Sequence, residues 1–267
     1  GRATRAARFI YAIGGDDGTA AGAMDSIEAA SVSPFGVLGA WQTLPSTLPV
    51  PRTLAGAAVL DQQGRRFIYL VGGNDGAIVV GTVLRAEVLD PTRSPEIENL
   101  DFTPDTAAAF VGPGVPPGGW NYKVAAVFDA ADTENPSGES LPSDVQPLTV
   151  PMMPAVDVII EWSAVPNAVG YRIYRSPTPG LGTGTEELIA TVGATTSYTD
   201  TGNDVPDPAQ VPLAIGDLGN WATVATLNTP REGLGVAIAA DPDTAAGFFL
   251  YAFAGHDATP AVFNTYE

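Results

Sequence analysis

The sequence contains no cysteine, a single histidine (His256) and a single lysine (Lys123). The absence of cysteine excludes disulfide bonds, thiol catalysis and cysteine-ligated zinc, and one histidine excludes a histidine-rich metal site in this chain. Basic residues are scarce, because 12 Lys and Arg stand against 30 Asp and Glu for a net charge of −18. This balance argues against a nucleic-acid partner, which needs a basic face, and against docking on anionic lipid.

Several sequence patterns of catalysis and membrane insertion are also missing. No apolar run approaches the roughly 20 residues of a membrane-spanning helix, so we expect no membrane insertion in this segment. The chain has no Gly-x-Ser-x-Gly nucleophile elbow and no phosphate-binding loop, and no nucleophile stands beside His256, which reads as a turn residue. Apolar residues, by contrast, make up 45% of the chain, with 30 Gly and 24 Pro. This composition predicts many short strands joined by tight turns.

One stretch occurs three times and organises the chain. Residues 66–76 read as a short apolar strand that runs into a double glycine and a polar turn. Residues 8–18 repeat this pattern, and residues 249–257 are a degraded copy. Tyr69 follows Tyr11 by 58 residues. A period of this length, built from short strands, is typical of a β-propeller.

The order of residues within one period resembles the kelch repeat. It runs Tyr-x-x-Gly-Gly, then a Glu-bearing strand (26–32 or 83–90), then Trp, then Pro-Arg before a strand of small residues, and it covers about 145 residues in two pieces. The resemblance implies that the glycines let strands pack closely and that the Trp and Arg side chains pack between neighbouring blades. The residues that receive these structural roles are Gly14, Gly15, Gly72, Gly73, Trp41, Trp221, Arg52 and Arg231.

The second repeat is interrupted. The Trp expected after residues 83–90 arrives only at Trp221, and Tyr251 follows Tyr69 by 182 residues, which exceeds one period by 124. The stretch 94–217 is 124 residues long, so we expect a whole domain to be inserted there.

The expected organisation therefore has three segments. Residues 1–93 form the first kelch-like blades, 94–217 the insert, and 218–267 the continued, incomplete propeller. The last residues, 262–267, fall where the Glu-bearing strand stands in the other copies. Because both ends fall within a repeat, we expect a piece of a longer protein.

The insert has the pattern of a small β-sandwich, with alternating strands at regular spacing. Trp162, predicted to be a core residue, and the following strand 171–175 resemble the central strands of a fibronectin type III domain. Residues 122–127 with 138–140 resemble its last hairpin, which here comes first, so the resemblance is to a permuted domain. The predicted class is all-β, with partial kelch-like propeller blades interrupted by an immunoglobulin/fibronectin III-like β-sandwich.

Polar residues recur in the turn after each double glycine, and they have two interpretations. Asp and Asn tolerate tight turns and bond to the local backbone. Alternatively, their oxygens converge on calcium, which needs six to eight oxygen ligands and is the one candidate cofactor. The residues concerned are Asp16, Asp17, Asn74, Asp75 and Asp257.

No catalytic residue can be assigned from the sequence. The repeats and the adhesive-type insert favour a non-enzymatic surface or structural protein that binds a protein or glycan surface, or other subunits of an assembly. The expected location is extracellular, on a bacterial cell surface or on a bacterial or phage virion. Tyr171, Tyr174 and Tyr198 alternate within strands, which favours sheet packing over stacking on sugar. Whether the chain is an enzyme stays open, since the alternative is a fragment of a propeller-type carbohydrate-active hydrolase or oxidase with its active residues in other blades.

Overall fold

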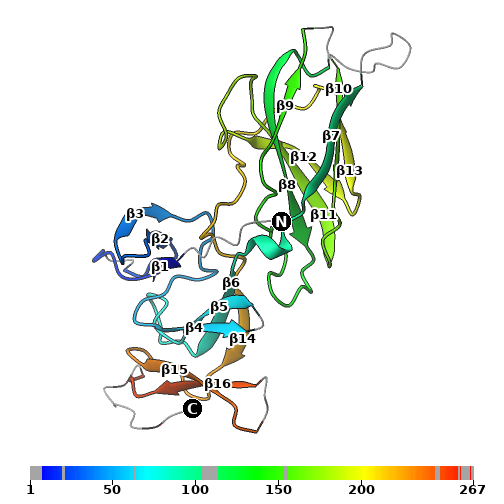
Figure 1. The fold of residues 1–267 in the computed structure, drawn as a ribbon. Coiled ribbons are helices and arrows are strands. Elements are labelled where there is room, and N and C mark those ends of the chain that lie inside the picture. The colour runs from blue at the N-terminus through cyan, green and yellow to red at the C-terminus, as the bar shows by residue number, and fades with distance from the viewer. Residues whose placement is uncertain are drawn as a thin grey trace. The chain divides into compact units, whose positions relative to one another are not determined.

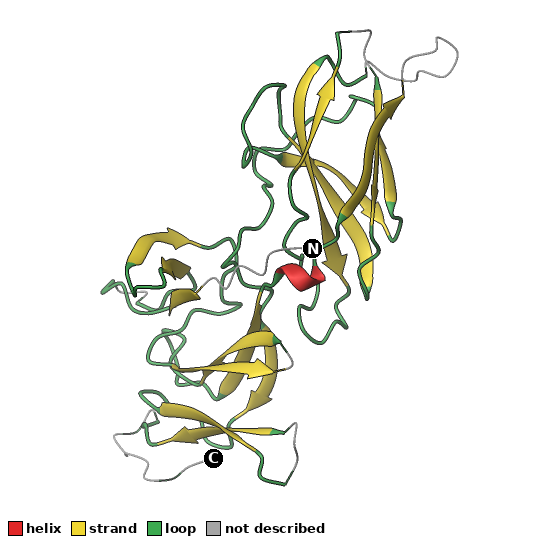
Figure 2. Ribbon diagram, viewed as in Figure 1, coloured by secondary structure: helices red, strands yellow, loops and turns green. Residues whose placement is uncertain are grey.

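The fold is built almost entirely from strands. The computed structural model describes residues 8–19, 22–62, 64–103, 114–152, 156–243, 247–257, 259 and 265. In these residues every sheet pairing is antiparallel, and the one helical element is a short 3-10 turn, η1 (Pro91–Arg93) (Figure 2). The predicted all-β class is therefore confirmed. The described portion of the chain holds no helix with the length and apolar character needed to cross a membrane.

The chain divides into two compact units. Unit 1 comprises Gly1–Leu89, Glu134–Pro136 and Gly216–Glu267, and unit 2 comprises Asp90–Thr133 and Ser137–Ile215. The repeat period places the corresponding borders at residues 94 and 217.

Unit 1 contains three antiparallel sheets, with strand orders β1-β2-β3, β14-β6-β5-β4 and β15-β16 (Figure 1). Within the described residues these sheets do not close into a ring, so the propeller stays a prediction. The strands are β1 (Arg8–Ile13), β2 (Ile27–Val32), β3 (Leu38–Thr43), β4 (Gly56–Gln62), β5 (Arg65–Val71), β6 (Thr82–Val88), β14 (Ala222–Thr226), β15 (Gly235–Ala240) and β16 (Phe248–Phe253).

The middle sheet is assembled from two distant regions of the sequence. The chain leaves this sheet after Val88, and Val88 forms a bridge with Leu218 where the chain returns. β14 then pairs with β6, with Ala222 opposite Arg85. Because departure and return lie side by side, a domain-sized excursion between β6 and β14 leaves the sheet continuous.

The middle sheet is also the one that is covered on both faces. Ile68 and Leu70 of β5 belong to a core shared with the first sheet, whereas Val71 belongs to a core shared with β15 and β16. Burial on both faces explains why β5 reads as a continuous apolar run. β1 carries the same motif but alternates between exposed and half-buried residues.

The Glu-bearing strands of the two repeats correspond, but their glutamates do not. Glu28 lies opposite Ala12 and is exposed, whereas Glu87 lies opposite Phe67, is buried and pairs with Arg65 at 3.0 Å. The turn before β2 is longer, with Met24 and Val80 as the residues that pair with the second glycine of each repeat. Because side chains alternate between faces, the spacing of 17 residues from Tyr11 puts Glu28 on the opposite face from that tyrosine, whereas the spacing of 18 residues puts Glu87 on the same face as Tyr69.

Unit 2 consists of two antiparallel sheets, with strand orders β13-β10-β7 and β12-β11-β8-β9, that share one apolar core (Figure 1). The hairpin partners β8 and β9 precede the other strands of their sheet in the sequence, and the fibronectin-like identity of this unit stays a prediction. The strands are β7 (Ile97–Thr103), β8 (Gly118–Phe128), β9 (Gln146–Val150), β10 (Asp157–Trp162), β11 (Ala168–Arg175), β12 (Glu187–Gly193) and β13 (Ser197–Asp200).

Two differences from the sequence predictions stand out. The sequence pattern does not predict β7, because apolar and polar residues do not alternate regularly along it. The alternation is broken where the pairing of β10 with β7 shifts register, between Glu161 and Trp162. The strand predicted over 262–267 lies outside the described residues apart from Thr265.

Candidate binding site at the double-glycine turns

The first residue of each double-glycine turn has a left-handed backbone. The φ angles of Gly14, Gly72 and Ala254 are 61°, 59° and 60°. A Cβ atom on Gly14 would lie 2.3 Å from the carbonyl oxygen of Arg52, and one on Gly72 would lie 2.4 Å from that of Arg231. The backbone that leads into the next sheet thus occupies the space of a side chain. Glycine is required here by that close approach, because Ala254 shows that the left-handed φ by itself admits a methyl group.

Arg52 joins the first sheet to the second. Its carbonyl oxygen accepts a hydrogen bond from Gly15 N at 2.7 Å, and its Nη2 donates to Thr82 Oγ1 at 2.8 Å. The residue is 4% exposed. Burial lowers the pKa of its guanidinium, while the nearby charge of Asp75 opposes that shift.

Arg231 repeats this arrangement between the second and third sheets. Its carbonyl oxygen accepts from Gly73 N at 2.9 Å, and its Nη1 donates to the carbonyl oxygens of Ala254 and Thr265 at 3.3 Å each. The residue is 1% exposed. Each arginine therefore bonds to two neighbouring sheets, through its backbone on one side and its guanidinium on the other.

The acidic turn residues bond to their own turns. The Asp75 carboxylate accepts from Ile78 N and Ala77 N at 2.8 and 2.9 Å, and the Asp17 carboxylate accepts from the Thr19 hydroxyl and Thr19 N at 2.7 and 2.9 Å. These bonds hold the pKa of both carboxyls below the usual range. Hydrogen bonds from the hydroxyl and the backbone N–H of Thr259 likewise lower the pKa of Asp257.

The preceding turn residues, Asp16 and Asn74, also bond within their own turns. Their side-chain oxygens accept from Gly18 N at 2.7 Å and Gly76 N at 2.9 Å. Among the described residues, no three His, Cys, Asp or Glu side chains come together in a group that could hold a metal ion. Each of these side-chain oxygens therefore has a hydrogen-bond partner in its own turn.

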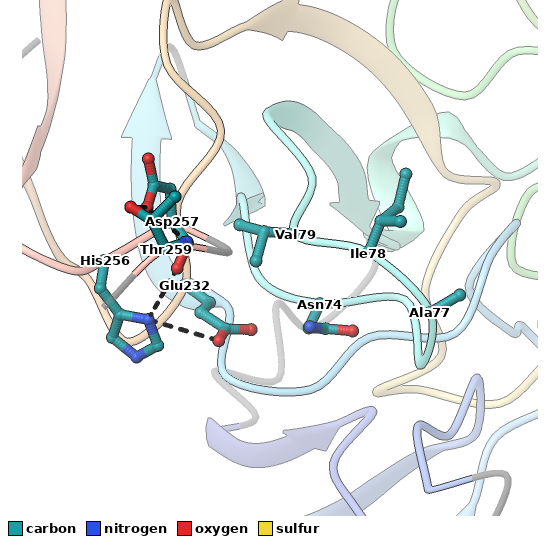
Figure 3. A pocket seen from close by; sticks show the side chains of 8 residues that line it. All are labelled: Asn74, Ala77, Ile78, Val79, Glu232, His256, Asp257 and Thr259. Atoms are coloured by element: carbon teal, nitrogen blue, oxygen red, sulfur yellow. Dashed lines mark hydrogen bonds and ion pairs between the residues drawn. The ribbon is translucent and has the colours of Figure 1, made fainter. Parts of the chain in front are cut away.

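A pocket of about 510 Å³ lies between the turns of the second and third sheets. Figure 3 shows the Glu232 carboxylate between the His256 ring and the Asn74 amide, with Val79 and Ile78 along another wall. We call this the turn pocket, and the residues that line it are Asn74, Ala77, Ile78, Val79, Glu232, His256, Asp257 and Thr259.

His256 occupies the turn position of Asn74. The bridge between Glu232 and His256 repeats the bridge between Thr53 and Asn74. The Nδ1 atom of His256 lies 3.5 Å from Glu232 Oε1 and 3.2 Å from the Asp257 carbonyl oxygen (Figure 3). Nδ1 therefore faces a carboxylate and a backbone carbonyl oxygen, with the other nitrogen, Nε2, on the far side of the ring.

Comparison with known proteins adds nothing to the kelch and fibronectin resemblances, which rest on the sequence pattern. No protein-family model and no curated protein matches the chain.

Sequence reasoning did not single out Glu232, the most buried acidic group of the turn pocket. A signal was present, because Glu232 follows Arg231 as Thr53 follows Arg52. A carboxylate thus stands where the earlier repeat has a small hydroxyl, at a position next to a buried arginine.

The predicted structural tryptophans differ in environment. Trp162 is 2% exposed in the core of unit 2, with its ring centroid 5.3 Å from that of Tyr171. Trp221 is partly buried against the core of the first two sheets of unit 1, whereas Trp41 is 47% exposed. Trp41 lies opposite Ala30 on β3, a strand that is exposed along its whole length.

The tyrosines considered for sugar stacking in unit 2 are mostly buried. Tyr171 is 3% exposed and Tyr174 is fully buried, so the sugar interpretation is wrong for both. The Tyr174 hydroxyl donates to Glu139, and the partly buried Tyr198 hydroxyl donates to Asp204. Their polar ends therefore serve the internal hydrogen bonding of the sandwich.

Proposed function

We propose that the chain is a non-enzymatic binding or structural module of an extracellular assembly, on a bacterial cell surface or a virion, that recognises a protein or glycan surface. The turn pocket supports this proposal. It combines one apolar wall with polar groups, of which Asn74, Asp257 and Thr259 are held in place by their own turns, and this is the usual composition of a recognition site.

The chemistry of the turn pocket favours binding over turnover. None of the described residues that line it is a serine, cysteine or lysine, and the hydroxyl of Thr259 donates to Asp257. The Asp257 and Thr259 side chains are thereby engaged in fixing their turn. A site of this kind presents a pre-ordered surface, which reduces the entropy cost of binding.

The test is a glycan array and a protein pull-down with the whole chain, together with a hydrolase and oxidase screen. We expect saturable binding and no turnover. Turnover that survives removal of residues 94–217 would overturn the non-enzymatic proposal. If the folded chain binds no glycan and no protein, the recognition proposal is overturned.

One observation favours the alternative of a carbohydrate-active enzyme. His256 Nδ1 faces Glu232 Oε1 at 3.5 Å, so a carboxylate stands behind the ring, on the side where a general base has its orienting carboxylate. If this pair served catalysis, the whole chain would show turnover that His256→Gln abolishes. The screen therefore includes His256→Gln as the variant that separates the two functions.

A further inference from the structure

The turn pocket contains a negative charge that is only partly compensated. Glu232 is 9% exposed, and its Oε2 atom has no hydrogen-bond partner within the described stretches of the chain. Its other oxygen faces His256 Nδ1 at 3.5 Å, which is longer than a normal hydrogen bond. A buried carboxylate in this state is costly, so a donor that reaches it gains more than it would at the surface.

The groups around Glu232 keep the site acidic. Asp257, on the same pocket, is a second carboxylate, and its Oδ1 is engaged by Thr259. The nearest arginine in sequence, Arg231, donates its Nη1 to two backbone carbonyl oxygens. Charge complementarity thus favours a cation, as does the net charge of −18 for the whole chain.

The shape and lining of the turn pocket indicate which kind of cation fits it. Ala77, Ile78 and Val79 form an apolar wall beside the acidic end, and Ile78 is 62% exposed (Figure 3). A group with an aliphatic stem and a compact charged tip satisfies both features, since the stem covers apolar surface while the tip meets the carboxylate. A guanidinium is suited less well, because its planar fork favours a carboxylate with both oxygens open. The described lining holds no Trp, Tyr or Phe ring on which a sugar could stack.

We propose that the turn pocket binds a lysine side chain of a partner protein, with the ammonium at Glu232 and the methylene groups along Ile78 and Val79. This inference rests on the proposed binding function and specifies its partner. A glycan partner would instead offer neutral hydroxyl groups to the acidic end of the pocket, and these would not compensate the charge of Glu232.

The experiment is an amide-shift titration of the whole ¹⁵N-labelled chain by NMR. The probes are Nα-acetyl-lysine methylamide and its uncharged counterpart, Nα-acetyl-norleucine methylamide. We expect the lysine probe alone to shift the amides of Asn74, Val79 and His256, with a Kd on the order of millimolar, which is about −4 kcal/mol. Glu232→Gln should weaken this binding by about tenfold or more. The control Glu28→Gln, an exposed glutamate on β2, should leave it unchanged.

Several outcomes would overturn the inference. These are equal binding of the norleucine probe, equal binding by Glu232→Gln, or shifts confined to other regions of the chain. If Glu232→Gln fails to fold, the comparison of the two probes on the unaltered chain at low and high salt decides, because only the ammonium contact weakens with salt. A positive glycan array without lysine binding would defeat this inference and leave the proposed function standing, whereas turnover abolished by His256→Gln would defeat the proposed function.

Discussion

At the scale of single residues, the first glycine of each turn is held by two constraints that substitutions can separate. Gly72 has a left-handed φ of 59° and a carbonyl oxygen of Arg231 where its Cβ would be. Gly36 has a φ of 80° but open space around the same position. The pair distinguishes backbone strain from the close approach of a neighbouring sheet.

We predict that Gly72→Ala lowers the free energy of unfolding by about 3 kcal/mol, since the added methyl must push the backbone of Arg231 away. Gly36→Ala should cost only about 1 kcal/mol, the strain of its φ. Urea denaturation of both variants measures the difference. Equal losses would mean that the sheets separate without cost and would contradict the packing argument.

At the same scale, Asp75, Asp17 and Asp257 can show whether the acidic turn residues serve their own turns or bind calcium. Because hydrogen bonds from Ile78 and Ala77 lower the pKa of Asp75, the folded state binds its proton less tightly than the unfolded state. The contribution of Asp75 to stability is therefore present above its unfolded pKa of 3.8 and is lost as pH falls through its lower folded pKa.

We expect carboxyl titration by NMR to give a midpoint below 3.8 for Asp75, and likewise for Asp17 and Asp257. Millimolar calcium should leave the titration and the melting temperature unchanged, as should a chelator. A calcium-dependent rise in melting temperature would instead establish the metal interpretation of these turns.

At the scale of elements, the two buried arginines explain how the sheets of unit 1 hold together. Arg231 is 1% exposed, and its guanidinium bonds to carbonyl oxygens beside the third sheet. Removing a buried charged donor leaves those acceptors without their partner.

We predict that Arg231→Met lowers the free energy of unfolding by about 2–4 kcal/mol and speeds hydrogen exchange in β15 and β16. The matched control is Arg66→Met, because Arg66 pairs with Asp61 at 3.2 Å between side chains that are both about half exposed. That exposed pair should contribute no more than about 0.5 kcal/mol. Equal stability of the two variants would contradict the role of Arg231 between the sheets.

At the scale of the whole molecule, the buried tyrosines determine the response to alkaline pH. Burial raises the pKa of Tyr11 to about 12, with Asp217 adding to the shift. Burial likewise raises the pKa of Tyr122, Tyr174 and Tyr198 above the usual range. The folded state then holds these protons more tightly than the unfolded state, so their contribution to stability is full below the unfolded pKa of 10.0 and falls as pH rises above it.

We expect the free energy of unfolding to fall steeply above about pH 10 and phenolate absorbance to rise in two phases, the later one coinciding with unfolding. In concentrated urea, all tyrosines should titrate together. Tyr174→Phe should reduce the late phase. A single phase near pH 10 with the fold intact would contradict the burial of these hydroxyls.

The sequence by itself determined the all-β class and most strands, because apolar alternation and Gly/Pro turns are local properties. β5 and β1 were predictable as copies of one motif for the same reason. The turn position of His256 was also predictable, since it follows the repeated strand at the spacing of Asn74.

Only the tertiary structure decided what those positions do. Burial depends on which sheets cover a strand, so the same motif is buried on both faces in β5 and only half-buried, on one face, in β1. The spacings of 17 and 18 residues from Tyr11 to Glu28 and from Tyr69 to Glu87 are visible in the sequence, but only the sheet packing decided that Glu87 is buried and Glu28 exposed. Glu232 became a member of the turn pocket because a bridge to His256 and the turn of another sheet converge on it, and such long-range contacts leave no periodic trace in the sequence.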